Sequence, residues 1–168
     1  MESYITDDIF TRQVNLKTLK AWEPFSDCVS ILFTFQKLDV ADGDDELRDW
    51  RIFWVSGITL LRAVGHVLAK VDKHKSAQHK EVIDRNWETF RSEESENVVL
   101  WKFIEKERNN LIKTYSWGAR LAKDDYGYSV EYENRENAFD LFREAVYWWR
   151  YQLEKIEAEL YQLPSSGQ

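Results

Sequence analysis

A small group of polar side chains interrupts the segment WKFIEKERNNLIKTY, which begins at Trp101 and is typical of a helix. At about 100° per residue, Trp101, Arg108 and Tyr115 form a line along the margin of its apolar stripe, because they are seven residues apart. Asn109 and Lys113 are four residues apart and are neighbours further round the helix. A guanidinium, an amide and an ammonium group can together bind, orient and neutralise a phosphate.

A second pair of basic residues lies in the most apolar part of the chain. The segment WRIFWVSGITLLRAVGHVLAKV carries Arg62 and His66 four residues apart, so both lie on one face of a predicted helix. An imidazole can accept and donate a proton near neutral pH, which suits general acid-base catalysis. If this face meets the first segment, one polar cleft is lined by Arg62, His66, Arg108, Asn109 and Lys113.

These residues also have purely structural interpretations. Arg108 can pair with Glu105 or Glu107, or with a carboxylate on another helix, as charges at the margin of a core often do. His66 can be a core histidine that is hydrogen-bonded to the backbone or to a carboxylate, and Lys113 can be an ordinary solvated lysine. The sequence leaves both interpretations open.

Several large classes of catalytic site are absent from the sequence. The three histidines, at positions 66, 74 and 79, form no HExxH arrangement, and no paired Glu-x-x-His motif occurs. Glycine-rich phosphate loops and the GxSxG nucleophile elbow are also missing. Cys28 is the only cysteine, which excludes an internal disulfide and a cysteine-rich zinc site. We therefore expect no metal site and no cofactor.

The eight residues RNNLIKTY resemble the R-N-x-x-x-H-x-Y signature of HEPN-domain proteins. These proteins are helical bundles, and many act as metal-independent ribonucleases in toxin-antitoxin and phage-defence systems. Arg108, Asn109 and Tyr115 stand at the family spacing, whereas Lys113 occupies the position of the family histidine. The resemblance implies a homodimer in which the motifs of two protomers form a composite cleft for RNA.

The family chemistry is an attack of a 2′-hydroxyl on the adjacent phosphate, assisted by the histidine. A lysine has an unperturbed pKa of about 10.4, so Lys113 would stabilise negative charge without accepting a proton. The resemblance thus implies a protein that binds RNA or a nucleotide at Arg108, with weak or no endoribonuclease activity. Arg62, Trp101 and Tyr115 are the further binding candidates, although Tyr115 also suits packing with a polar tip. The alternative is a non-catalytic helical module for dimerisation or for docking to a protein partner.

Apolar periodicity predicts the elements that position these residues. One helix is expected to end near residue 38, with a break near Pro24. The other predicted helices, of which the second is weak and short, span about residues 45–72, 77–90, 94–122 and 135–162. We therefore predict an all-α fold, an antiparallel four-helix bundle with a short extra helix.

The remaining segments are predicted from their composition. DKHKSAQHK is expected to be a polar linker, and KDDYGYSVEYEN to be a loop or a short hairpin before the last helix. Residues 1–11 and 163–168 are expected to be irregular tails. Small residues in the predicted helix at 45–72, including Gly57 and Gly65, should let a neighbouring helix or a partner chain approach closely.

The length and composition of the chain limit its domain count, its nucleic-acid binding and its location. With 168 residues the chain is expected to form a single domain, and its 15% aromatic content with only six glycines and two prolines favours long helices. A net charge of −7 argues against broad adhesion to nucleic acid, although it leaves room for a local basic site. The acidic start lacks the pattern of a signal peptide, and the apolar run 52–61 is too short for a bilayer. We expect a cytoplasmic protein without a membrane partner.

Overall fold

The computed structural model describes residues 17–39, 49–124, 127–133 and 136–162, and these ranges are mostly helical. The predicted all-α character is therefore confirmed in outline, with one small antiparallel sheet added to it. The expected irregular tails at 1–11 and 163–168 lie outside the described residues. The elements are α2 (Trp22–Asp39), α4 (Trp50–Lys70), the 3₁₀ helix η1 (Asp72–His74), α5 (Ala77–Ser92), the π-helix η2 (Val99–Glu105), α6 (Lys106–Thr114), β1 (Arg120–Asp124), β2 (Gly127–Glu131) and α7 (Ala138–Gln162).

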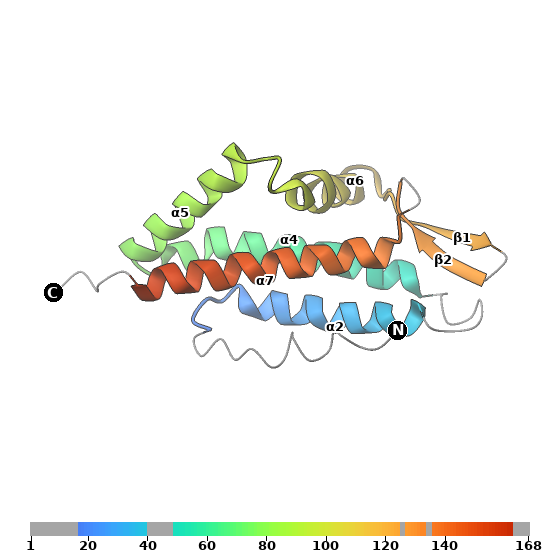
Figure 1. Cartoon of the computed structure of the whole chain (residues 1–168), viewed down its shortest axis with the longest axis horizontal. Coiled ribbons are helices and arrows are strands. Elements are labelled where there is room, and N and C mark those ends of the chain that lie inside the picture. Colours follow the sequence, from blue (N-terminus) through green and yellow to red (C-terminus); the bar gives the residue numbers. More distant parts are fainter. Residues whose placement is uncertain (1–16, 40–48, 125–126, 134–135, 163–168) are drawn as a thin grey trace.

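Three long helices, α2, α4 and α7, pack against one another (Figure 1). The helix α5 and the η2–α6 segment lie along the other side of α4 and α7, and the hairpin projects beyond one end (Figure 1). A core of large side chains fills the interior, with Trp54, Phe142 and Trp149 among its biggest fully buried members. This arrangement buries the apolar stripe of each helix against its neighbours.

The helix α4 is the central element, as its composition predicts. Its two glycines lie where α7 passes closest: a Cβ on Gly57 would be 2.6 Å from Phe142, and a Cβ on Gly65 would be 2.9 Å from Trp149. The small residues therefore serve a neighbouring helix of the same chain. By length and composition alone, the segment Trp50–His74 is apolar enough to cross a membrane, with a mean hydropathy of 1.6, and the core helix of a soluble protein has the same property. The apolar segment Trp50–His74 is thus longer than the run 52–61 on which the sequence-based expectation rested.

The helix α7 corresponds to the last predicted helix, at 135–162, and it buries one line of apolar side chains, its apolar seam. Its residues at spacings of three and four are buried, namely Phe139, Phe142, Val146, Trp149, Leu153 and Ile156. The helix begins at Ala138, three residues later than the predicted start at 135, because Asn137 caps it. The Asn137 side chain accepts hydrogen bonds from the backbone N–H groups of Phe139 and Asp140, at 2.9 and 3.1 Å.

Two buried carboxylates hold the beginning of α2. Glu157 of α7 accepts a hydrogen bond from the N–H of Leu19 at 2.9 Å, and Asp72 accepts one from the N–H of Ala21 at 2.9 Å. Pro24 lies in the first turn of α2, where its missing N–H costs no helical hydrogen bond. The segment expected to be a polar linker begins with the 3₁₀ helix η1, and its first residue, Asp72, is fully buried.

The helix predicted at 94–122 is shorter than expected and is not uniform. Instead of one helix over 94–122, a π-helix leads into α6, which ends at Thr114. Tyr115 then adopts a left-handed backbone conformation with φ of 50° and closes the helix. The segment expected to be a loop or hairpin, which starts at Lys123, contains the end of β1 and all of β2, in a hairpin where Asp124 pairs with Gly127. The first three residues of β1 lie in the range predicted to be helix.

Candidate functional site

The side chain of Arg108 is half-buried on α6 and is oriented by its neighbour. Its Nη1 donates a hydrogen bond to Oδ1 of Asn109 at 2.9 Å. Neither of the expected acidic partners neutralises it, because Glu105 pairs with Arg62 at 2.8 Å and Glu107 is turned into the core. None of the ion pairs found among the described residues includes Arg108. Its guanidinium therefore keeps N–H groups for another acceptor.

Arg62 lies beside the same side of α6. Its partner Glu105 is the last residue of η2 and precedes Arg108 by three residues, and Ile112 follows Arg108 by four residues on α6. Residues at these spacings share one side of a helix. The Arg62–Glu105 ion pair thus places α4 along the side of α6 that carries Arg108.

An aromatic cluster stands at the other end of this α4–α6 boundary. The guanidinium of Arg51 lies 4.9 Å from the ring centre of Trp117, and Tyr115 meets Trp117 edge-on with ring centres 5.3 Å apart. Tyr115 is 70% exposed. A groove of about 420 Å³ is lined here by Arg51, Ile52, Val55, Ser56, Tyr115 and Trp117.

Glu107 fixes the loop that carries these aromatic rings. Its carboxylate is fully buried and accepts hydrogen bonds from Trp54 Nε1 at 2.9 Å, from the N–H of Gly118 at 2.9 Å, and from the Tyr132 hydroxyl at 3.2 Å. A buried carboxylate needs such donors, because each one replaces lost hydration. Burial, together with the nearby charge of Glu107, raises the pKa of Tyr132.

Three of the sequence candidates lie apart from Arg108 or have a packing role. Lys113 is exposed, and an interval of five residues turns it about 140° round α6 from Arg108. His66 is exposed one turn along α4 from Arg62, at its helical spacing of four. The Trp101 ring is half-buried, and its Nε1 donates to the backbone oxygen of Phe90 at 2.7 Å.

Arg62 thus pairs with Glu105, three residues before Arg108, whereas Lys113 lies about 140° round α6 from Arg108. We give the name α4–α6 strip to five residues along the boundary of these helices, defined as Arg51, Arg62, Arg108, Tyr115 and Trp117. In the described part of the chain, no group of three or more His, Cys, Asp or Glu side chains is arranged to hold a metal ion.

Sequence reasoning missed Arg51 and Trp117, and it named Glu107 only as a possible partner of Arg108. A signal for Glu107 was present, because it follows the buried Phe103 by four residues and so falls within the apolar stripe. Arg51 precedes Arg62 by eleven residues, which is about three turns of one helix face. Trp117 carried no signal, because its position depends on where α6 ends.

Comparison with protein-family models, with curated proteins and with solved structures finds no match. The resemblance to HEPN domains therefore rests on the residues from Arg108 to Tyr115.

Proposed function

We propose that the protein binds single-stranded RNA or a nucleotide along the α4–α6 strip, as a HEPN-like helical bundle in the cytoplasm. The observation that carries the proposal is the Arg108 guanidinium, which Asn109 orients and no described carboxylate neutralises. In this proposal α2, α4, α7 and the η2–α6 helix are the four members of an antiparallel bundle. The short α5 is the extra helix.

The two ends of the strip suit the two parts of a nucleotide. Arginine binds phosphate oxygens through charge-assisted hydrogen bonds, which fits Arg108 and, beside it, Arg62. An exposed aromatic ring next to an arginine is a stacking surface for an unpaired base, which fits Tyr115, Trp117 and Arg51. Because the whole protein is acidic, this local basic and aromatic surface would bind short single strands and not duplex nucleic acid in general.

Cleavage of bound RNA is the second part of the proposal, and it depends on a group for proton transfer. The family reaction needs a group that accepts and donates a proton, and the ammonium of Lys113 stabilises charge without doing so at neutral pH. In this proposal two protomers of a homodimer bring Lys113 of one chain towards Arg108 of the other, and His66 is the imidazole that α4 carries. We therefore expect weak, metal-independent endoribonuclease activity or none.

Fluorescence anisotropy with a labelled, mixed-sequence single-stranded RNA in EDTA tests the binding. The Arg108→Ala variant should bind about 10- to 100-fold more weakly, because a hydrogen bond to a charged group contributes about 1.5–3 kcal/mol. The matched control is Arg91→Ala, which removes the same charge from an exposed side chain on α5. The dependence of affinity on salt should also flatten in Arg108→Ala, with the log-log slope falling by about 0.7 for each phosphate that the variant no longer neutralises.

The proposal is wrong if the wild type binds no RNA, or if Arg108→Ala and Arg91→Ala bind as the wild type does. Cleavage is tested separately with Lys113→His, which restores the histidine of the family motif. A rise in RNA cleavage in EDTA that disappears in the Arg108→Ala, Lys113→His double variant supports a degenerate ribonuclease. Equal cleavage by both variants argues against it.

A second candidate function is that of an interaction module. Large apolar side chains in and next to the strip are exposed, with Tyr115 at 70%, Ile52 at 66% and Ile112 at 63%. Such side chains suit a homodimer interface or the surface of a protein partner. If this is the function, Ile112→Glu should lower the molar mass measured by light scattering while RNA remains unbound by either protein.

A further inference from the structure

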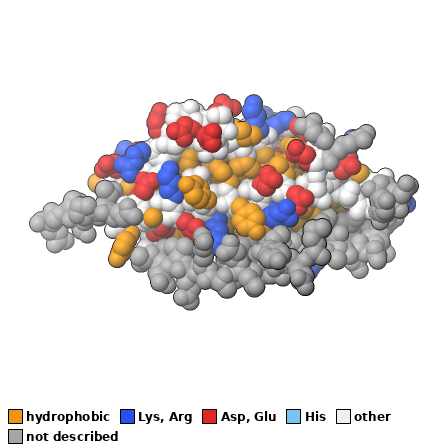
Figure 2. Space-filling view, viewed as in Figure 1, with side chains coloured by type: hydrophobic (Ala, Val, Ile, Leu, Met, Phe, Trp, Pro, Cys, Tyr) orange, Lys and Arg blue, Asp and Glu red, His pale blue; other side chains and the backbone are white. Residues whose placement is uncertain are grey.

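A second groove lies on the other side of the η2–α6 segment, between η2, the end of the hairpin and the first turns of α7. It has a volume of about 560 Å³, within the range of roughly 300–1,000 Å³ typical of binding sites. Apolar side chains of Val98, Val99 and Leu141 contribute to its surface, and Val98 is 49% exposed. Figure 2 shows hydrophobic side chains gathered near the centre of one face, with acidic and basic side chains around them.

The charge around the groove is predominantly negative. Lys106 and Glu133 form an ion pair at 2.6 Å and cancel each other. Glu96, Glu136 and Glu144 remain, against a single lysine at position 102. Within the described part of the chain, no lysine or arginine forms an ion pair with these three carboxylates. The groove therefore combines an apolar interior with a net negative rim.

The backbone at this groove is unusual. The seven residues of η2 form a π-helix, which is wider than an α-helix and occurs often at functional sites. The widening lies where η2 meets α7, at the side chains of Val99 and Phe103 that line the groove. In a regular α-helix the side chains after Val99 would point in directions other than those they have in the π-helix. The π-helix therefore determines which of these side chains reach the groove.

We propose that this groove is a docking site for a basic amphipathic helix of a partner protein. Such a helix places apolar side chains at intervals of three and four residues into a groove and carries lysine or arginine on its flanks. Its apolar side chains would lie on Val98, Val99 and Leu141, and its basic flanks would meet Glu96, Glu136 and Glu144. Charge complementarity selects this occupant, since RNA would be repelled by the same rim. The site is separate from the α4–α6 strip and does not depend on the function proposed for that strip.

The probe for this proposal is a fluorescein-labelled amphipathic peptide of about five helical turns, built from leucine on one face and lysine on the other. The wild-type protein should bind it in an anisotropy titration, and a matching peptide with glutamate in place of lysine should not bind. The double variant Glu136→Lys, Glu144→Lys should weaken binding at least about tenfold, because it reverses two charges at the rim. Val98→Asp should also weaken binding, because it places a charge on the apolar surface.

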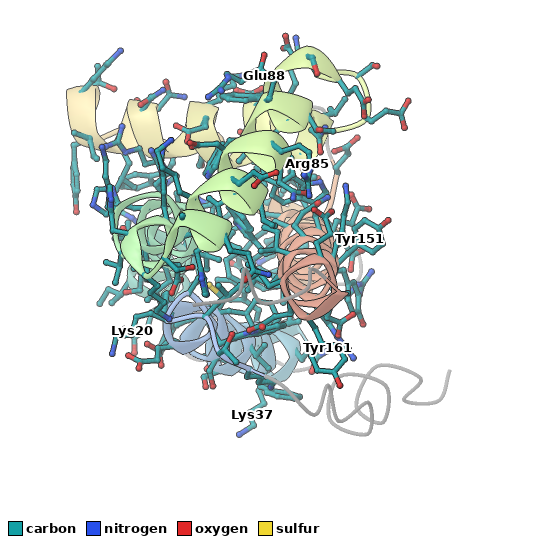
Figure 3. The ribbon with its side chains drawn as sticks, turned by 90° about the vertical axis from the view of Figure 1, so that its left-hand side faces the viewer. Lys20, Lys37, Arg85, Glu88, Tyr151 and Tyr161 are labelled. Carbon is teal, nitrogen blue, oxygen red and sulfur yellow. The ribbon has the colours of Figure 1, made fainter. Side chains whose placement is uncertain are left out.

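The matched control is the double variant Glu81→Lys, Glu88→Lys, which makes the same change in net charge on α5. Both control side chains are 72% exposed, and Figure 3 labels Glu88 on α5. The control should keep the wild-type affinity within about twofold, since it leaves the groove intact. All three variants alter exposed residues, and circular dichroism checks that they are folded.

Three results would overturn the proposal. The first is the absence of binding of the lysine peptide to the wild type. The second is an equal loss of affinity in the α5 control and the rim variant, which indicates unspecific attraction to an acidic protein. The third is unchanged affinity in Val98→Asp, which shows that the peptide lies elsewhere. If the rim variant changes the oligomeric state while the peptide does not bind, a second copy of the chain occupies the groove and the proposed partner is wrong.

Discussion

The replacement Gly57→Ala tests the close packing of α4 against α7. A Cβ at this position would lie 2.6 Å from Cε2 and 3.0 Å from Cζ of the Phe142 ring, and 3.1 Å from Ile31. The ring cannot move away easily, because Phe142 is fully buried and Phe35 packs against it edge-on with ring centres 5.0 Å apart. The added methyl group must therefore displace a core side chain or the helix itself.

Two opposing contributions determine the result. Alanine stabilises a helix interior by about 1 kcal/mol relative to glycine. Overpacking a dense core costs about 1–3 kcal/mol, and the 2.6 Å approach to Phe142 favours the upper part of that range. We expect Gly57→Ala to lower the free energy of unfolding by about 1–2 kcal/mol, which corresponds to about 2–4 °C in Tm for each kcal/mol.

Urea unfolding followed by tryptophan fluorescence measures this difference. The control is Thr59→Ala, at an exposed position of the same helix, where a change of at most about 0.5 kcal/mol is expected. The double variant Gly57→Ala, Phe142→Leu gives a further check, because removal of the ring should reduce the cost of the methyl group and the two effects should not add. If Gly57→Ala is as stable as the wild type or more so, the packing argument is refuted.

Two further predictions concern buried titratable groups. Burial raises the pKa of the Cys28 thiol, and its side chain is inaccessible, so Ellman's reagent should leave the native protein almost unmodified and react promptly in urea; an immediate reaction of the native protein would contradict this. Burial also raises the pKa of the Tyr132 hydroxyl in the folded state, so its contribution to stability is complete below the unfolded pKa of about 10 and is lost as the pH rises further. The wild type should lose more stability than Tyr132→Phe between pH 8 and 11, measured by urea midpoints, and parallel curves would show that Tyr132 is not the cause.

Much of the fold could be predicted from the sequence. The seam of α7 follows from apolar residues at spacings of three and four, and the central place of α4 follows from its nearly continuous apolarity. The place of Pro24 in the first turn follows from its lack of an N–H group. These features depend on neighbours along the chain, so local patterns are enough to find them.

The end of α6 could not be predicted in the same way. Its apolar periodicity continues past Thr114, yet the helix ends there because the chain turns at Tyr115 and the N–H of Gly118 bonds to Glu107. The π-helix likewise leaves no clear mark in the sequence. Glu107 also accepts hydrogen bonds from Trp54 and Tyr132, which are distant along the chain.

The candidate site also has features that the sequence predicts and features that only the tertiary structure determines. The sequence by itself determined which residues have the chemistry to bind phosphate, because side-chain type and helical spacing single out Arg108, Asn109 and Lys113. Only the tertiary structure decided which of them have acidic partners and which way they face. Glu105 pairs with Arg62 and Glu107 is held in the core, so Arg108 has neither acidic neighbour as a partner, whereas Lys113 is turned away from it. The physical reason is that a charge is neutralised by the nearest partner in space, and for Glu105 that partner is on another helix.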